Sequence, residues 1–205
     1  MLVRRFTGER AWLDFEHSLE DGTRSLRDVL QAQAALVRGT FADITALLRR
    51  EIHVDPSFAS FVAACDARGD ALTIVSSGIE AIIRDRLSEL GVRDMTIVAN
   101  GVDPDPNGWR ILFRDDVPNG TDKAALVRAA GAAGNHTIFI GDGRSDYEAA
   151  LAADVRFAKR GLPLERYLIA RGVPFEPFAS FADVQSSISE VISGLARRRH
   201  ERRLW

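Results

Sequence analysis

Two carboxylates follow an apolar run in the second half of the chain. Residues 137–140 (Thr-Ile-Phe-Ile) have the composition of a buried strand, and the segment Gly141-Asp142-Gly143-Arg144-Ser145-Asp146 comes directly after them. Carboxylates at the end of a buried strand suit a hard cation such as Mg²⁺, which prefers oxygen ligands. The structural alternative is that Asp142 shapes a turn and Asp146 begins a helix, where negative charge is favoured. We favour the metal site, because this combination of acids and glycines after a strand is specific.

A pair of serines follows another apolar run. Residues 71–75 (Ala-Leu-Thr-Ile-Val) predict a short strand, and Ser76-Ser77-Gly78 leads from it into a predicted helix. A hydroxyl group together with successive backbone N–H groups at the start of a helix can bind an anion. Taken alone, this segment is more simply explained as a cap in a strand–helix turn.

A lysine lies between these two segments along the chain. Lys123 stands near the start of a helix that is expected to run from residue 121 to residue 133. A lysine at this end of a helix opposes the macrodipole, which indicates another reason for its position. Together the three segments predict a phosphate site. Ser76 and the amides of Ser77 and Gly78 would hold phosphate oxygens. Lys123 would neutralise their charge, and Asp142 would hold the metal.

The elements that position these residues fall into two zones. Residues 6–50 predict helices without a strand, and Ser25 with Asp28 and Thr40 with Asp43 resemble capping boxes. From residue 54 onward predicted strands alternate with helices, which indicates a parallel sheet covered on both faces. We therefore expect an α/β fold with a helical cap at 1–52 and an α/β core at 53–205. The predicted strands are 71–75, 96–99, 110–113, 137–140 and 155–158, the second and third forming a hairpin and the last completing the sheet. The predicted helices include 25–39, 56–68, 79–90, 121–133 and 145–153.

The composition excludes several classes of protein. The chain has 205 residues, and its formal net charge of -2 gives no sign of nucleic-acid binding. Cys65 is the only cysteine, so no disulfide can form within the chain, and no apolar run is long enough to cross a membrane. Since no signal peptide is visible, we expect a cytoplasmic protein without a membrane partner. A basic cluster at the C-terminus is most simply explained as a solvated, fraying helix end. It comprises Arg197, Arg198, Arg199, Arg202 and Arg203.

With these motifs in place, the sequence resembles the phosphatases of the haloacid dehalogenase superfamily. Residues 72–78 (Leu-Thr-Ile-Val-Ser-Ser-Gly) resemble the second motif of that family, Lys123 its third, and residues 140–146 its fourth. The resemblance covers nearly the whole chain. It is nearest to the branch that contains phosphoserine phosphatase and a methylthiopentenyl phosphate phosphatase, and residues 155–159 and 172–178 look more like the latter.

The resemblance implies a fold, a reaction and a cofactor. The fold would be a Rossmann-like parallel sheet with helices on both faces and a small helical cap. The reaction would be Mg²⁺-dependent hydrolysis of a small phosphorylated metabolite through an aspartyl-phosphate. Ser76, Lys123 and Asp142 would be catalytic. Asp142 and Asp146 would bind Mg²⁺, or Asp146 would instead support Lys123.

One motif of the family has no counterpart here. The first motif is a strand ending in Asp-x-Asp-x-Thr, whose first Asp attacks phosphorus and whose second is the general acid and base. A look-alike begins at Asp14, with Glu16 in place of the second Asp. We reject it because residues 8–13 form no apolar strand and the apolar spacing around Asp14 is helical. We therefore expect that Met1 is not the true start and that the first, central strand of the sheet lies upstream.

Other interpretations stay open on the sequence alone. The chain could be a catalytically inactive phosphate-binding or interaction protein of the same fold. A Rossmann-type nucleotide-binding domain is disfavoured, because the sequence has no early glycine loop with a following acid. The sequence does not identify the substrate either, because phosphoserine, methylthiopentenyl, phosphocholine-like and sugar phosphates are all compatible with it. The oligomeric state is also open.

Overall fold

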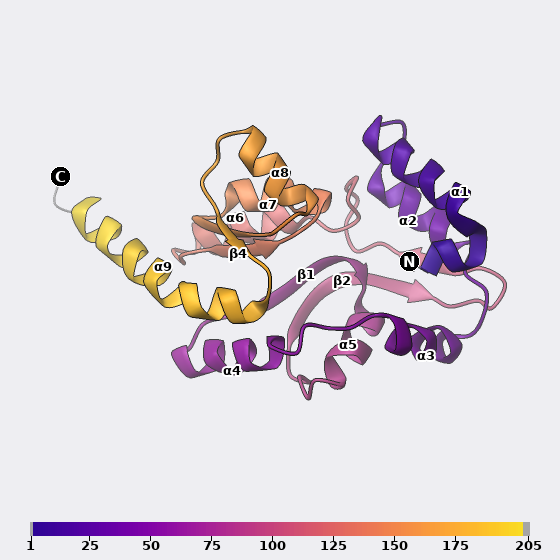
Figure 1. Cartoon of the computed structure of the whole chain (residues 1–205), viewed down its shortest axis with the longest axis horizontal. Coiled ribbons are helices and arrows are strands. Elements are labelled where there is room, and N and C mark those ends of the chain that lie inside the picture. Colours follow the sequence, from indigo (N-terminus) through magenta and orange to yellow (C-terminus); the bar gives the residue numbers. More distant parts are fainter. Residues whose placement is uncertain (1, 203–205) are drawn as a thin grey trace. The chain divides into compact units, whose positions relative to one another are not determined.

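The fold is described from a computed structural model of the chain. It describes the backbone of residues 2–202 and the side chains of residues 10–193. The chain forms two compact units, and Figure 1 shows their helices and strands coloured along the sequence. Unit 1 consists of the described parts of Met1–Val54 and Leu72–Asp122, and unit 2 of those of Asp55–Ala71 and Lys123–Trp205. The division into a cap at 1–52 and a core at 53–205 stays a prediction.

Three helices begin unit 1, namely α1 (Leu2–Glu20), α2 (Leu26–Ala34) and α3 (Phe41–Glu51). Both predicted capping boxes are confirmed, with Ser25 capping α2 and Thr40 capping α3. The helix predicted to reach residue 39 is shorter, because the chain turns after Ala34. The Ala34 carbonyl there accepts a hydrogen bond from the Trp109 N–H at 2.9 Å, so tertiary pairing ends the helix earlier than the local pattern indicates.

The sheet of unit 1 has the strand order β1-β2-β3. Its strands are β1 (Thr73–Ile79), β2 (Thr96–Asp103) and β3 (Arg110–Leu112), and α5 (Glu80–Ser88) connects the first two. β1 is parallel to β2 (Figure 1), and β2 is antiparallel to β3, which confirms the predicted hairpin. The indole of Trp109 is buried in the hydrophobic core beside this sheet and donates to the Gly39 carbonyl. The core cluster consists of Ala34, Val37, Ile44, Leu48, Trp109 and Ile111.

Unit 2 has a parallel sheet with the strand order β4-β5-β6. The expectation that residues 155–158 form the last strand is wrong, because β6 follows at the edge of the sheet. Pro177 lowers the strand signal of β6, yet an edge strand tolerates a residue that cannot donate to the ladder. The elements are α4 (Phe58–Arg68), α6 (Lys123–Ala132), β4 (Ile138–Gly141), a 3₁₀ turn η1 (Arg144–Asp146), α7 (Tyr147–Ala152), β5 (Val155–Lys159), α8 (Pro163–Ala170), β6 (Glu176–Phe178) and α9 (Phe181–Arg202).

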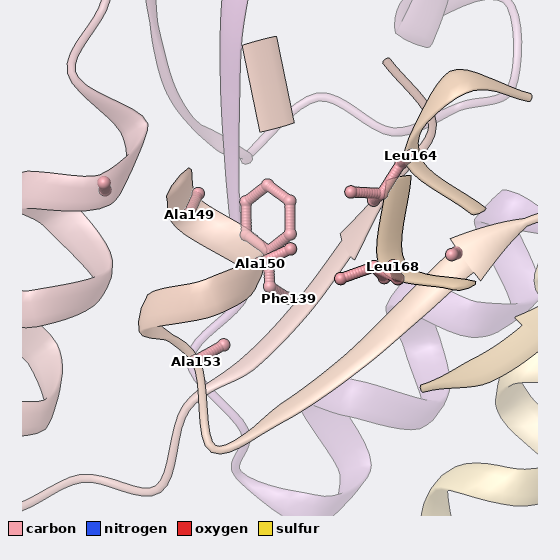
Figure 2. Packing of buried hydrophobic residues seen from close by; sticks show 8 residues of the cluster. Phe139, Ala149, Ala150, Ala153, Leu164 and Leu168 are labelled. Carbon is pink, nitrogen blue, oxygen red and sulfur yellow. The ribbon is translucent and has the colours of Figure 1, made fainter. Parts of the chain in front are cut away.

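The core of unit 2 packs helices against β4. Figure 2 shows the Phe139 ring among the alanines of α7 and two leucines of α8. Ala149 and Ala150 are fully or almost fully buried, as are Leu164 and Leu168. The small α7 side chains let this helix approach the strand closely, and burying each leucine contributes about 2 kcal/mol. This packing fixes the segment that follows β4, where the two predicted carboxylates lie.

The α/β class with a parallel sheet and covering helices is confirmed. Within the described residues, no helix is both long enough and apolar enough to cross a membrane. Cys65 is buried in α4 together with Phe58 and Phe61. The interpretation of the C-terminal arginine cluster lies outside the described side chains.

Candidate active site

The serine segment lies in a bulge at the carboxyl end of β1. Val75 pairs with Val98 and Ile79 with Asn100, so β1 advances four residues while β2 advances two. A bulge frees backbone groups from the ladder and bends the strand. The segment Ser76–Ser77–Gly78 therefore belongs to the strand rather than to the start of a helix, and α5 begins only at Glu80.

A hydrogen bond within the bulge already uses one of its hydroxyl oxygens as an acceptor. The Gly78 N–H donates to Ser76 Oγ at 3.0 Å. A side chain at Gly78 would place its Cβ 3.2 Å from the same hydroxyl oxygen, so glycine keeps this turn open. Ser77 Oγ is buried and makes no hydrogen bond to the described residues. Two hydroxyls and two amides are thus gathered where the strand ends.

Lys123 is buried at the start of α6 in unit 2. Its Nζ donates to Asp146 Oδ1 at 2.6 Å and to Ser145 Oγ at 2.9 Å. The pairing explains why a lysine stands at a helix end that the macrodipole disfavours for a cation. Sequence reasoning missed the Ser145 contact, although this serine lies within the acidic segment that drew attention to the region.

Asp146 connects the lysine to the turn after β4. Its Oδ2 accepts hydrogen bonds from the N–H groups of Asp142 and Gly143, both at 2.9 Å. A Cβ at Gly141 would lie 2.8 Å from the same oxygen, so this close approach requires glycine. Both carboxylate oxygens of Asp146 therefore have partners within unit 2, and its predicted role as a metal ligand stays a prediction.

Asp142 follows β4 and differs from Asp146 in its surroundings. Its side chain is solvent-exposed, but nearby protein atoms still displace part of its water. This desolvation raises the pKa of Asp142, and the Asp146 carboxylate raises it further, while Lys123 and Lys159 act in the opposite direction. A raised pKa means that the negative charge of the carboxylate is not fully compensated by its neighbours.

The donor set around Asp142 fits a magnesium ion that takes few protein ligands. Among the side chains of residues 10–193, no group of three or more His, Cys, Asp or Glu could hold a metal. Magnesium commonly keeps several waters and binds through one or two carboxylates together with substrate phosphate oxygens. Asp142 suits this mode, since it offers exposed carboxylate oxygens whose charge a cation would offset.

The predicted site residues divide between the two units. Lys123, Asp142 and Asp146 are brought together in unit 2 around the turn after β4. Ser76, Ser77 and Gly78 lie in unit 1, in the bulge of β1. The first group supplies a cation, a carboxylate and ordered amides. The second supplies hydroxyls and amides of the kind that bind phosphate oxygens.

Sequence reasoning missed two buried residues beside the β1 bulge. Asn100 and Thr121 are 0% and 1% exposed, and each hydrogen-bonds a carbonyl of the serine segment. A signal for Asn100 was present, because this polar residue directly follows the strand predicted at 96–99, and ligands bind beyond the carboxyl ends of the strands in parallel sheets. In the structure β2 continues through Asn100 to Asp103. Thr121 gave no such signal, because it stands at the start of the helix predicted at 121–133, where a threonine is expected as a cap.

Comparison with known proteins gives matches along most of the chain. The family model of haloacid dehalogenase-like hydrolases matches residues 3–151. The polyol phosphate phosphatase PYP1 of Saccharomyces cerevisiae is 30% identical over 204 residues, which cover 92% of this chain and 84% of that protein. The 2-hydroxy-3-keto-5-methylthiopentenyl-1-phosphate phosphatase of Microcystis aeruginosa is 28% identical over 169 residues, covering 82% of this chain and 76% of that protein.

Solved structures give a similar result for the fold. A phosphoserine phosphatase from T. onnurineus superimposes with a TM-score of 0.64 and is 20% identical, covering 90% of this chain and 84% of that chain. A substrate-bound phosphoserine phosphatase gives a TM-score of 0.65 at 15% identity. At these identities the likeness concerns the fold alone.

Proposed function

The chain belongs to the haloacid dehalogenase-like hydrolase family, as its motifs predicted, and on this premise we propose that it hydrolyses the phosphomonoester of a small cytoplasmic metabolite. The reaction would need Mg²⁺ and would pass through an aspartyl-phosphate. The observation that carries the proposal is the buried Lys123–Asp146 pair beside the turn of Asp142. A buried cation held next to a partly desolvated carboxylate is a common arrangement at sites that handle charged substrates.

In this proposal each group has one role. The Ser76 hydroxyl and the amides of Ser77 and Gly78 bind phosphoryl oxygens. Lys123 offsets the charge of the phosphoryl group, and Asp146 keeps Lys123 in place. Asp142 would ligate Mg²⁺, which when bound polarises the phosphoryl oxygens and offsets their charge.

The covalent step needs a carboxylate nucleophile. An aspartate oxygen attacks phosphorus, and the ester oxygen leaves as an alcohol with a proton taken from a general acid. Water then attacks the aspartyl-phosphate and gives a proton back to that group, which releases inorganic phosphate and restores the carboxylate. Residues 1–205 contain no Asp-x-Asp-x-Thr sequence. We propose that the nucleophile lies in a segment outside these residues rather than at Asp14, which lies within helix α1.

The relatives suggest a substrate class. Two phosphatases similar to this chain are named for a polyol phosphate and for a methylthiopentenyl phosphate. Both names describe phosphate esters of compounds that carry hydroxyl groups, so we propose a small hydroxylated phosphomonoester as the substrate. A panel of one polyol phosphate, the methylthiopentenyl phosphate and phosphoserine separates these possibilities by their kcat/KM values.

The test is phosphate release from p-nitrophenyl phosphate with and without Mg²⁺. We expect no turnover by residues 1–205 and Mg²⁺-dependent turnover when the in-frame upstream segment is added. In the extended protein, Asp142→Asn should lower kcat/KM by about 100-fold or more. Asp94→Asn is the matched control, because Asp94 is an exposed carboxylate that precedes the amino end of β2.

The outcomes discriminate between the candidates. Turnover by residues 1–205 alone would mean that the proposal about the nucleophile is wrong and that Asp14 must be tested. Phosphate binding without turnover in either protein would favour the second candidate, a phosphate-binding or interaction protein of the same fold. That candidate is favoured by the absence of the Asp-x-Asp-x-Thr sequence from residues 1–205.

A further inference from the structure

Two buried polar side chains of unit 1 hold the carbonyl groups of the β1 bulge. Asn100 Nδ2 donates to the Ser77 carbonyl at 2.8 Å, and Thr121 Oγ1 donates to the Ser76 carbonyl at 3.0 Å. Neither carbonyl pairs with β2, since the register skips from Val75 to Ile79. The side chains therefore replace the ladder partners that the bulge removes. This replacement matters because a buried carbonyl without a partner is costly.

Holding a carbonyl also orients the amide of the same peptide. The peptide bonds here are trans, and in a planar trans peptide the C=O and the N–H point in opposite directions. The bond from Thr121 to the Ser76 carbonyl therefore turns the Ser77 N–H away from Thr121. The bond from Asn100 to the Ser77 carbonyl likewise turns the Gly78 N–H away from Asn100. That N–H donates to Ser76 Oγ, on the side opposite to the anchored carbonyl.

The side-chain amide of Asn100 has a defined orientation. Asn100 Oδ1 accepts the Arg114 N–H at 3.0 Å and lies 3.4 Å from Thr121 Oγ1. These contacts fix which end of the Asn100 amide faces the Ser77 carbonyl. Gly120 completes the arrangement, because its φ is +73° and a Cβ there would meet the Phe113 ring at 2.7 Å and Asn100 Nδ2 at 3.3 Å.

We propose that Asn100 and Thr121 are positioning residues that aim the Ser77 amide and the Ser76 hydroxyl at a phosphoryl group and hold the Gly78 amide, which donates to Ser76 Oγ, beside it. The inference rests on the proposed function, because it assigns the bulge as the part that binds phosphate. Two side chains from separate segments converge on consecutive carbonyls, and each is almost completely buried. Side chains that hold the carbonyls in this way orient the hydrogen-bond donors before the ligand binds, so little binding energy is used to order them.

The experiment measures binding of inorganic phosphate to the purified chain by calorimetry, with ¹H–¹⁵N spectra of the same samples. Thr121→Val keeps the side-chain shape and removes the hydroxyl, while Thr121→Ser keeps the hydroxyl. Asn100→Asp keeps the acceptor oxygen and replaces the donor with an oxygen that repels the Ser77 carbonyl. Thr45→Val is the matched control, because the buried Thr45 hydroxyl also bonds backbone carbonyls but lies within α3.

We expect Thr121→Val and Asn100→Asp each to raise the Kd for phosphate about tenfold, as loss of one aligned donor predicts. Thr121→Ser and Thr45→Val should stay within about twofold of the unchanged chain. Phosphate should shift the Gly78 amide resonance in the unchanged chain and in Thr121→Ser, and shift it much less in Thr121→Val. This spectral readout separates a positioning role from a purely structural one. Thermal melting of each variant independently records any loss of stability.

The inference is overturned if the unchanged chain binds no phosphate or if phosphate leaves the Gly78 amide resonance in place. It is also overturned if Thr121→Val binds phosphate as tightly as Thr121→Ser. Failure of the proposed function is a different result, namely phosphate binding without ester hydrolysis in the extended protein. In that case the affinities of the variants still decide the inference.

Discussion

The buried pair of Lys123 and Asp146 allows a quantitative test by Lys123→Met. The two side chains are 8% and 7% exposed, and Nζ lies 2.6 Å from Oδ1. Methionine fills a similar volume but leaves the Asp146 carboxylate buried without its counter-charge. The Asp142 and Gly143 amides still donate to it. Removing one partner of a buried pair costs about 3–5 kcal/mol, and because these amides remain we expect the lower end, about 3 kcal/mol.

The matched control is an exposed pair in the same chain. Arg110 and Asp103 lie 2.9 Å apart, with side chains 66% and 56% exposed. Arg110→Met should therefore cost no more than about 1 kcal/mol. Asp146→Asn supplies the second arm of a double-mutant cycle. The variant Lys123→Met/Asp146→Asn should be destabilised less than the sum of the single changes, by about 2 kcal/mol.

The assay is urea unfolding in magnesium-free buffer, followed by far-ultraviolet circular dichroism. The free energy of unfolding of each variant is obtained by linear extrapolation, and similar m-values indicate that the unfolding transitions are comparable. The reasoning is refuted if Lys123→Met costs as little as Arg110→Met, or if the two changes at the buried pair are additive. Either result would mean that water or another group compensates the Asp146 charge.

Three further predictions follow from the same unit. Gly141→Ala should destabilise the chain by about 1–3 kcal/mol in urea unfolding, because the new Cβ would lie 2.8 Å from Asp146 Oδ2. The Thr137 N–H and hydroxyl lower the pKa of Asp154, so its stabilisation is present above the unfolded pKa of about 3.9 and is lost as the pH falls through the lower folded value. Asp154→Asn should thus lower the Tm at pH 7, and the difference should shrink toward pH 3; an unchanged difference would contradict this assignment. Asp142→Asn should weaken Mg²⁺ binding at least about tenfold in calorimetry, and equal affinity would exclude Asp142 as a ligand.

Local signals made much of the fold predictable. The capping boxes at Ser25 and Thr40 and the helix end predicted at residue 68 depend on residues within one helical turn, so the sequence pattern was sufficient. The hairpin of β2 and β3 was also visible, because a turn-rich segment separates two runs of strand formers. In the candidate site, the nearness of Lys123 to Asp146 was expected from the family motifs, although their spacing of 23 residues carries no local signal.

What could not be predicted depends on pairing between distant segments. The extra length of β1 and its bulge arise from its register with β2, which the local composition of residues 71–75 does not contain. Asn100 meets Ser77 across 23 residues, and Thr121 meets Ser76 across 45. Such contacts exist only after the sheet has formed. A polar residue at a strand end can mark a candidate, but its partner has to come from the fold.

The strand orders have a consequence for how the protein behaves in solution. β1 and β4 are each the outer strand of their own three-stranded sheet, and neither Thr73–Ile79 nor Ile138–Gly141 contains a proline or a charged residue. Natural sheets usually protect such edge strands with lysine, proline or a covering segment, because free N–H and C=O groups can pair with strands from other chains. Within each unit taken by itself, β1 and β4 therefore present uncharged edges suited to the addition of a further strand. Concentration-dependent self-association of this polypeptide would begin there.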